Sequence, residues 1–339
     1  MLRQPIIQQF ITPIVKVYLK KDEKKEGEDH KQNFYSLPEF NKWYKEVPNP
    51  NAWKVDYYKG LGTSTSNEFK DYFNDLSRHK IPFRYSGTEC DDRIKLAFQR
   101  ERVDDRKTWL TEYMVECERR LQANEDELTL YDRERIPYVT YKDFIDKELV
   151  IFSYEDCQRA IPSVVDGFKP GQRKVMWSCF KRNDKSKVKV AQLAGSVSEL
   201  SAYHHGEVSL METIIKLAQD FVGSNNVNLL EPHGQFGSRL QGGKDHAAAR
   251  YIFTKPSPLA RIIYPETDDH LYRFKTDDNK KVEPEHYAPI VPMVLVNGSA
   301  GIGTGWSSNF PNHDIHDCIK NVRRMINGDE PLGMPLLHI

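Results

Sequence analysis

The sequence has little of what marks a membrane protein or a strongly charged nucleic-acid binder. Its 339 residues carry 49 basic and 49 acidic side chains, so any basic surface must be local. The longest strongly apolar run, residues 288–296, is too short to cross a bilayer. Polar residues and prolines interrupt the apolar N-terminal stretch, which argues against a signal peptide. We therefore expect no membrane partner.

Cysteine is scarce as well, and its pattern excludes two kinds of site. The five cysteines are odd in number and form no C-x-x-C pair. They predict reduced intracellular thiols and argue against a disulfide framework or a zinc site. We predict no metal ligands in this chain. The cysteines are Cys90, Cys117, Cys157, Cys179 and Cys318.

What the sequence does contain is an ordinary globular composition, 39% hydrophobic and 29% charged, in a chain long enough for two or three domains. The β-branched residues in 11–19 predict a strand, and 52–60 predict another. Ser36 has the character of an N-cap for a helix over 36–47, and residues 61–78 predict a glycine turn, a Ser/Thr cluster and then an amphipathic helix. This alternation is typical of the end of an α/β domain.

The middle of the chain predicts a connection between two units. Charges of both signs cover residues 84–136, which is the pattern of solvent-exposed helices. Thr140 and Asp143 then form a capping pattern that opens a second unit. From about residue 266 the chain predicts extended, proline-punctuated segments, with a helix over 314–328 near the end.

Three short predicted helices, over 170–183, 190–201 and 205–223, precede a glycine-rich ribbon. That order indicates a winged helix-turn-helix. Gly223 is expected to end the third helix. One face of that helix is expected to carry Val208, Met211, Ile215, Ala218 and Val222.

The charge that balances overall is uneven locally. Between residues 159 and 190, nine basic residues stand against two acidic ones, a net charge of +7 over 32 residues. A charge run is usually a solvated face, but a single-signed run beside a helix-turn-helix pattern favours phosphate binding. The basic residues are Arg159, Lys169, Arg173, Lys174, Lys181, Arg182, Lys185, Lys187 and Lys189.

Two surface patterns suggest chemistry. In SRLQGGKDHAAARYIFTK, residues 238–255, Arg250 precedes Tyr251. A tyrosine hydroxyl is a poor nucleophile unless a cation stabilises its anion, so from the residues alone Tyr251 is either a packing residue or a nucleophile. In GSAGIGTGW, residues 298–306, Ile302 stands between glycines. It is either part of a buried turn or an apolar wedge.

Long segments of the chain resemble one family. They include YYKGLGTSTSNEFKDYF, IPSVVDGFKPGQRKVMWSCFKRN, GQFGSRLQGGKDHAAARYIFT and PMVLVNGSAGIGTGWSSNFPNHD. Together they are similar to eukaryotic DNA topoisomerase II, the type IIA family, over nearly the whole sequence. The resemblance is to the middle of that family's longer chain, which runs from an ATPase domain through Toprim, winged-helix and tower domains to a coiled coil.

The resemblance implies a multi-domain α+β fold in four parts. The first is the C-terminal remnant of an α/β Toprim domain, and the second is a helical connector. A winged helix-turn-helix domain with the catalytic tyrosine follows, and the start of a mixed α/β tower domain ends the chain. The expected bounds, in the same order, are 1–75, 76–138, 139–265 and 266–339.

The resemblance also implies roles for single residues. Tyr251 would attack a DNA phosphate to form a 5′-phosphotyrosyl link, with Arg250 and His205 as further catalytic residues. Ile302 would wedge between base pairs. The expected DNA-binding residues are Lys59, Lys169, Arg173, Lys174, His204 and Ile302.

Cofactors and partners are likewise implied by the resemblance. The family uses Mg²⁺ and ATP, but the Toprim metal motifs E-G-D-S-A and D-x-D-x-D-G do not occur in this sequence. Nor do glycine-rich ATPase motifs, and the segment around Lys59 lacks the spacing of a nucleotide-binding loop. We expect double-stranded DNA as partner, a homodimer in the full-length family and a nuclear location. The alternative is a catalytically incomplete fragment that only binds and bends DNA, and we expect the isolated chain to be inactive.

Overall fold

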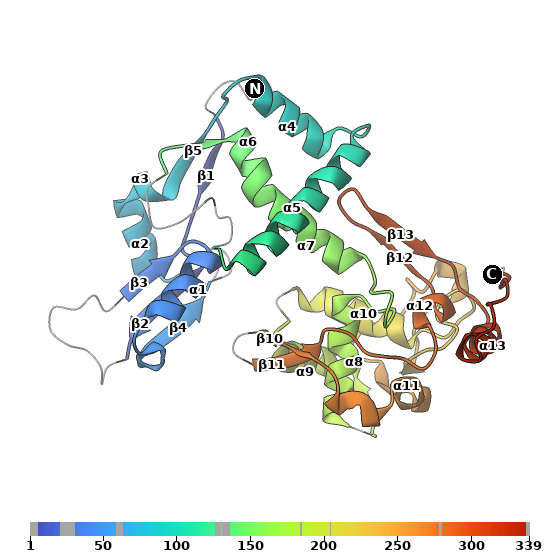
Figure 1. Ribbon diagram of the computed structural model, residues 1–339. Coiled ribbons are helices and arrows are strands. Elements are labelled where there is room, and N and C mark those ends of the chain that lie inside the picture. Colours follow the sequence, from blue (N-terminus) through green and yellow to red (C-terminus); the bar gives the residue numbers. More distant parts are fainter. Residues whose placement is uncertain are drawn as a thin grey trace. The chain divides into compact units, whose positions relative to one another are not determined.

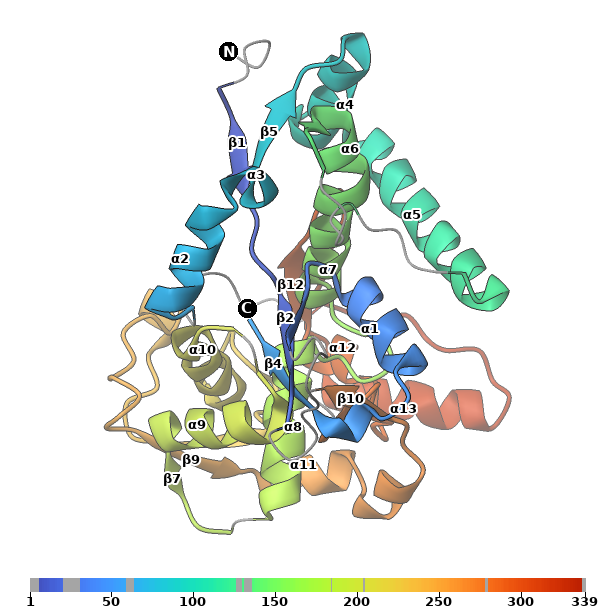
Figure 2. The same ribbon diagram turned by 90° about the vertical axis from the view of Figure 1, so that its left-hand side faces the viewer.

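The computed structural model divides the chain into two compact units, Met1–Glu155 and Asp156–Ile339. It describes residues 6–20, 31–58, 64–125, 130, 136–183, 185–203, 205–277 and 280–336. The boundary falls inside helix α7 (Val150–Ala160). Both units mix helices with small sheets, as Figures 1 and 2 show. The expected α+β class is confirmed, and the finer division into four parts stays a prediction.

The first unit contains an antiparallel sheet of order β3-β2-β4. Helix α1 packs on it through a cluster of Val15, Val17, Phe34 and Phe40. The Ser36 side chain accepts a hydrogen bond at the start of α1, so the predicted cap and helix are confirmed. The elements are β2 (Val15–Leu19), β3 (Lys31–Phe34), α1 (Leu37–Glu46), the 3₁₀ turn η2 (Pro50–Ala52) and β4 (Trp53–Tyr57).

The strand predicted over 11–19 is wrong in extent. The chain forms β1 (Gln8–Phe10) and then β2, and these two strands belong to different sheets. Between them lies Pro13, which has no N–H to donate to a sheet ladder. The N–H of Ile11 donates to the carbonyl of His79, the residue before the strand that pairs with β1. The N–H of Ile14 donates to the carbonyl of Phe34 in β3, which belongs to the other sheet.

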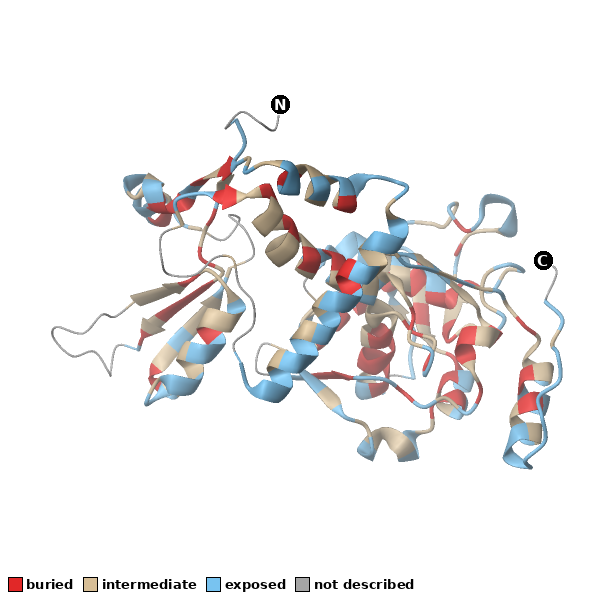
Figure 3. Ribbon diagram, turned by 45° about the horizontal axis from the view of Figure 1, so that its top comes forward, coloured by how far each residue is buried: buried red, intermediate tan, exposed pale blue. Residues whose placement is uncertain are grey.

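The second sheet of this unit has the order β1-β5-β6, with β1 antiparallel and β6 parallel to β5. The helices predicted from the mixed charge of residues 84–136 are present as α4 and α5, and α5 leaves most of its surface exposed (Figure 3). Thr140 caps the next helix through the backbone of Asp143, as predicted. The elements are α2 (Ser66–Asn74), α3 (Leu76–His79), β5 (Lys80–Arg84), α4 (Thr88–Phe98), α5 (Val103–Ala123), β6 (Val139–Thr140), α6 (Tyr141–Phe144), the π-helical turn η3 (Ile145–Leu149) and α7.

A buried lysine joins α2 to the central strand of the first sheet. Lys16 is fully buried on the face of β2 that points away from the valine core. Its ammonium group donates hydrogen bonds to the Glu68 carboxylate and the Tyr72 hydroxyl. Glu68 also accepts from the backbone of Thr65 at 2.7 Å, which closes a capping box at the start of α2.

The contacts keep both partners charged. Burial opposes the charge on Glu68, but hydrogen bonds from Lys16 and Thr65 outweigh it and lower the Glu68 pKa to about 2. Burial also acts against the Lys16 ammonium group, yet its hydrogen bonds with Glu68 and Tyr72 leave its pKa raised. The start of α2 therefore depends on an ion pair that persists over a wide pH range.

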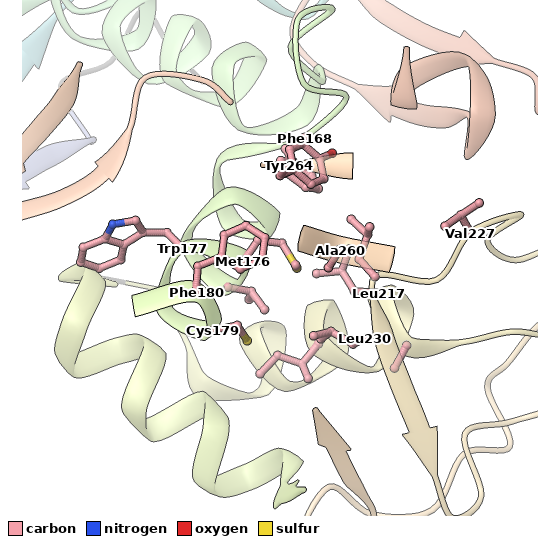
Figure 4. Close-up of a cluster of buried hydrophobic side chains, with 14 of the residues drawn as sticks. Phe168, Met176, Trp177, Cys179, Phe180, Leu217, Val227, Leu230, Ala260 and Tyr264 are labelled. Carbon is pink, nitrogen blue, oxygen red and sulfur yellow. The ribbon is translucent and has the colours of Figure 1, made fainter. Parts of the chain in front are cut away.

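In the second unit, the helices α8, α9 and α10 and a small antiparallel sheet of order β7-β9-β8 form the arrangement of a winged helix-turn-helix. Its core is shown in Figure 4, where Met176, Leu217, Leu230, Ala260 and Tyr264 are among the packed residues. The elements are α8 (Pro170–Arg182), β7 (Val188–Lys189), α9 (Val190–Ser201), α10 (Glu207–Ala218), β8 (Leu230–His233) and β9 (Phe253–Pro256). The expected order of helices and ribbon is confirmed.

The predicted apolar face of α10 is right in part, because Ile215 and Ala218 are buried and Met211 packs against the core, but it is wrong for two valines. Val208 is 70% exposed, and Val222 lies beyond the helix and is 62% exposed. The helix ends at Ala218 and not at Gly223, because Gln219 leaves the helical conformation. Apolar residues lie on more than one face, so periodicity alone could not select the stripe that meets α8 and α9. The buried residues are Leu210, Ile214, Ile215, Leu217 and Ala218.

The rest of the second unit packs around a buried carboxylate. Asp166 accepts hydrogen bonds from the Arg173 guanidinium at 2.7 and 3.0 Å and from the backbone N–H of Tyr287 at 3.0 Å.

Among the described residues, no helix has the length and apolarity to cross a membrane. The remaining elements are η4 (Arg239–Gln241), α11 (Pro258–Ile263), η5 (Glu266–His270), β10 (Phe274–Asp277), β11 (Lys280–Pro284), α12 (Met293–Val296), β12 (Ser299–Ile302), β13 (Ser307–Phe310) and α13 (Ile315–Ile326).

The Lys16–Glu68 pair generates the first prediction. Lys16→Met leaves a carboxylate buried without its cation and should lower the local stability of β2 by about 3–5 kcal/mol. Hydrogen exchange of the β2 amides measures the change. The Glu68 pKa lies below its ordinary value of 4.5 in the folded chain, so the pair stabilises above that pH and the contribution disappears as pH falls toward 2.

The matched control is the double variant Lys16→Met/Glu68→Gln, which leaves no unpaired charge. It should lose less stability than the single variant at neutral pH, and its β2 protection should vary less between pH 5 and pH 2. Equal losses in the two variants would contradict the role given to the ion pair.

Candidate nucleic-acid interface

The segment around Tyr251 is fastened to the N-terminus of α9. The N–H of Val190 donates to the carbonyl of Ile252 at 3.0 Å, and the N–H of Ala191 donates to the carbonyl of Ala249 at 3.1 Å. The first N–H groups of a helix have no partner within the helix, so these carbonyls satisfy them. The backbone on both sides of Tyr251 is therefore held by the helix.

The Arg250 and Tyr251 side chains lie together at the surface. Tyr251 is 65% exposed, whereas the next residue, Ile252, is buried in the core. The Arg250 guanidinium carbon lies 4.9 Å from the centroid of the Tyr251 ring. A cation beside an accessible phenol can stabilise a phenolate and the charge that develops on an attacked phosphate. The structure thus places two of the three predicted catalytic residues side by side.

The glycine-rich ribbon that leads to this pair is held by two polar side chains. The buried Gln219 amide donates to two ribbon carbonyls, at 2.9 and 3.2 Å. Gly237, with φ +95°, approaches Gly243 so closely that a Cβ there would lie 2.6 Å from the Gly243 backbone. The Asp245 carboxylate accepts two hydrogen bonds from Ser238 at 2.8 Å, and the one from the backbone N–H contributes most to lowering the Asp245 pKa.

Sequence reasoning misses Gln219 and Asp245. The predicted third helix includes Gln219, and no motif distinguishes a glutamine that supports a ribbon. The only available signal is the glycine pair at 242–243, which indicates a close backbone approach but not its partner.

Two of the predicted DNA-binding cations are used inside the fold. Arg173 is 4% exposed and pairs with the fully buried Asp166. Lys174 donates to the carbonyl of Ser201 at 2.6 Å and to the Glu283 carboxylate at 2.8 Å. Withdrawing either from its partner would leave a buried carboxylate unpaired. These contacts favour structural roles, and we leave both residues out of the proposed DNA surface.

Three exposed lysines of the charge run lie on the segment that leads into β7, the strand paired with β9. Lys185, Lys187 and Lys189 are exposed on the segment between α8 and α9. Lys189 belongs to β7, where it pairs with Phe253 of β9, two residues after Tyr251. These three lysines, which we call the β7 lysines, are better placed for a DNA phosphate than the buried Arg173.

Ile302 is the last residue of β12, next to the turn of the β12–β13 hairpin, and is 86% exposed. The glycines beside it allow the hairpin backbone to approach the end of α7. A Cβ on Gly301 would lie 1.9 Å from the Ala160 carbonyl oxygen, and one on Gly303 would lie 2.9 Å from the Cys157 sulfur. Since neighbouring strand residues point to opposite faces, Ile302 faces away from α7.

Two side chains fasten this hairpin. Lys169, at the start of α8, donates to the carbonyl of Ala300 at 2.6 Å. Burial, and then the nearby Lys216, lower the Lys169 pKa. The Cys157 thiol donates to the carbonyl of Thr304 at 3.2 Å. Lys169 therefore holds the hairpin that carries Ile302.

The remaining predicted residues are only partly placed. His205 is exposed between α9 and α10, and its ring makes an edge contact with Tyr203 at 5.4 Å. His204 and Lys59 lie outside the described residues. Within the residues that the structure covers, no group of three or more histidine, cysteine, aspartate or glutamate side chains is arranged to hold a metal ion.

Comparison with known proteins identifies the family. The family model for the A subunit of DNA gyrase/topoisomerase IV matches residues 159–338, and the one for the C-terminal associated domain of TOPRIM matches residues 10–157. This chain belongs to the type IIA DNA topoisomerase family. The two matches meet close to the boundary between the compact units, so each unit of this topoisomerase chain corresponds to one family model.

Relatives and a solved structure agree with this assignment. The chain is 59% identical to DNA topoisomerase 2-alpha of Mus musculus and 58% identical to that of Homo sapiens, over 98% of its length in both cases. It spans 21% of the length of either relative. A crystal structure of the Plasmodium falciparum topoisomerase II DNA-binding, cleavage and re-ligation domain is similar at 46% identity, with a TM-score of 0.76. The similarity covers 97% of this chain and 42% of that one.

The close approach at Gly301 generates the second prediction. Gly301→Ala places a methyl group against the Ala160 carbonyl and should destabilise the hairpin by about 1–3 kcal/mol, as overpacking typically does. Hydrogen exchange of the β12 and β13 amides measures the loss. The control is Gly195→Ala, in α9, where an added Cβ meets nothing within 4 Å. Unchanged hairpin protection in Gly301→Ala would contradict the packing described.

Proposed function

We propose that this chain is the DNA breakage-reunion part of a type II DNA topoisomerase, and that Tyr251 is its nucleophile. The observation that carries the proposal is the exposed Tyr251–Arg250 pair on a backbone held by α9. A tyrosine kept for packing would bury its ring, whereas this one is presented to solvent beside a cation. Membership of the topoisomerase family supports the same role.

The proposed chemistry is a reversible phosphoryl transfer. The Tyr251 hydroxyl oxygen forms a bond to a backbone phosphorus of DNA and loses its proton. The bond from phosphorus to the 3′ oxygen breaks, and that oxygen leaves as a hydroxyl after gaining a proton. Arg250 stabilises the negative charge on the phosphate during the transfer. The phosphotyrosyl bond keeps the energy of the broken phosphodiester, so the reverse attack reseals the strand without another energy source.

The proposed DNA surface has a gripping part and a bending part. The β7 lysines would contact phosphates, and the exposed His205 would donate to a phosphate near the cleaved bond. Ile302 would insert between base pairs, since an exposed apolar side chain on a fastened hairpin can exchange base stacking for a bent duplex. Two such chains would cut both strands and let another duplex pass.

Cofactors, assembly and location follow from the family alone. We propose that the full-length protein uses Mg²⁺ and ATP, acts as a homodimer and works in the nucleus. A metal ion would help to neutralise charge at the phosphate. The described residues offer no cluster of acidic, histidine or cysteine side chains that fits a metal ion, so none of them is assigned to metal binding. None is assigned to ATP either, since the sequence has no glycine-rich ATPase motif.

The alternative function is a module that binds and bends DNA without cutting it. The fastened hairpin with Ile302 favours bending but does not exclude cleavage, because cleavage by this family would also need DNA to be held. The two functions differ in whether a covalent link to Tyr251 forms.

The third prediction tests the nucleophile in the full-length protein. Tyr251→Phe should abolish the denaturant-resistant link between protein and supercoiled plasmid and leave DNA affinity nearly unchanged. The matched control is Tyr138→Phe, because Tyr138 is also exposed and has Arg84 over its ring at 4.8 Å. The control should keep full linking activity. Adducts that persist in Tyr251→Phe would refute Tyr251 as the nucleophile, whereas a lack of adducts in the unsubstituted protein would leave only the bending function.

The fourth prediction tests the wedge. Ile302→Ala should reduce the bend of a bound duplex, measured by fluorescence transfer between labelled ends, because the methyl side chain is too short to hold base pairs apart. Ile326→Ala is the control, since Ile326 is also highly exposed but lies on α13. A bend angle equal in both variants would count against the wedge, whatever the outcome for Tyr251.

A further inference from the structure

A cavity of about 270 Å³ lies in the second unit, and none of the residues that line it belongs to the glycine-rich ribbon that carries Tyr251. Its wall comes from α8, the α11–η5 region, the β10–β11 hairpin and Tyr287. The volume is just below the usual range of small-molecule sites, about 300–1,000 Å³, and suits a single ring system. None of the roles proposed above uses it.

The cavity is lined mainly by aromatic rings. Tyr287, which is 2% exposed, forms the innermost part of the wall. Its ring makes edge-to-face contacts with Phe180 at 5.7 Å and with Tyr272 at 5.1 Å. Trp177 and Phe274 complete the aromatic wall. Tyr272 and Phe274 are only half-buried, so a flat ligand could lie against their exposed parts, which favours aromatic over aliphatic ligands.

Cations of the chain already lie over three of these rings. Arg261 lies 3.8 Å from the centroid of Phe180 and forms two hydrogen bonds with Asp269, at 3.0 and 2.9 Å. Lys181 lies 4.7 Å from the centroid of the Trp177 ring. Lys281 lies 3.6 Å from that of Phe274.

This arrangement determines the charge of the ligand. A cage for a cationic ligand needs free faces on several rings, and here the chain's own cations lie over Phe180, Trp177 and Phe274. The one carboxylate of the wall, Asp269, is engaged by Arg261. Within the described part of the chain, no carboxylate forms an ion pair with Lys181 or Lys281, so both ammonium groups can accept an anion.

We propose that this cavity binds a flat aromatic anion the size of a fused bicyclic ring. The ring system would lie against the half-buried Tyr272, and the anionic group would meet the ammonium groups of Lys181 and Lys281. Such a site is independent of the proposed cleavage of DNA, and it would add a small-molecule ligand to this unit.

The test compares three probes of equal shape by calorimetry on the intact chain. Naphthalene-2-sulfonate is the anion, naphthalene-2-sulfonamide is the neutral analogue and 2-naphthylmethylammonium is the cation. The sulfonate should bind about tenfold more tightly than the sulfonamide, and the ammonium compound most weakly. Equal affinities for anion and neutral analogue, or no binding of any probe at millimolar concentration, would overturn the proposal.

Two lysine variants locate the site. Lys281→Gln should lower the affinity for the sulfonate about threefold and leave that for the sulfonamide unchanged. The control is Lys275→Gln, because Lys275 is exposed on the same hairpin but does not line the cavity. Both variants replace a surface lysine, so both should fold. An equal loss in the two variants would place binding elsewhere, and displacement of the sulfonate by duplex DNA would assign these lysines to the DNA surface instead.

Discussion

The second unit depends on one buried contact, the pair between Asp166 and Arg173. The Asp166 carboxylate accepts four hydrogen bonds, two from the Arg173 guanidinium and one each from the backbone N–H groups of Phe168 and Tyr287. The backbone carbonyl of Asp166 accepts a further one from the Tyr264 hydroxyl. A carboxylate with no exposed surface is tolerated only when it is fully paired, so the contact fixes the start of α8 relative to two distant segments. The hairpin anchor Lys169 and the aromatic wall of the cavity both follow from that placement.

The two exposed residues with proposed roles are presented in the same physical way. A side chain can point into solvent at a defined position only if its backbone is held from behind. At Tyr251 the holding groups are N–H donors of α9, and at Ile302 they are Lys169, Cys157 and the close approach of Gly301 to α7. In both cases an ordered backbone stands behind an exposed side chain, which is the preorganisation that phosphate attack and base-pair insertion require.

Local signals allow much of the fold to be predicted, and long-range contacts account for what cannot be. The helix after Ser36 and the helix 190–201 are predictable because caps and periodicity are local properties. The buried face of α10 is not, because packing chooses among several apolar stripes. At the candidate site, the exposed Tyr251 and Ile302 carry recognisable motifs. No motif marks the internal roles of Arg173 and Lys174, since the partner of Lys174 is Glu283, 109 residues away in the chain. The cavity likewise joins residues from 177 to 287 and leaves no mark in any single segment.

The internal use of Arg173 and Lys174 has a consequence for how this chain should respond to its ionic surroundings. Each cation that reaches a DNA phosphate displaces a condensed counterion, and the slope of log affinity against log salt counts these events, at roughly 0.9 per contact. Two of the nine basic residues in the charge run are committed to Asp166 and Glu283 and release nothing. A slope expected from the composition of this segment would therefore be too steep by about two ions, because the fold has already neutralised part of the charge that the sequence displays.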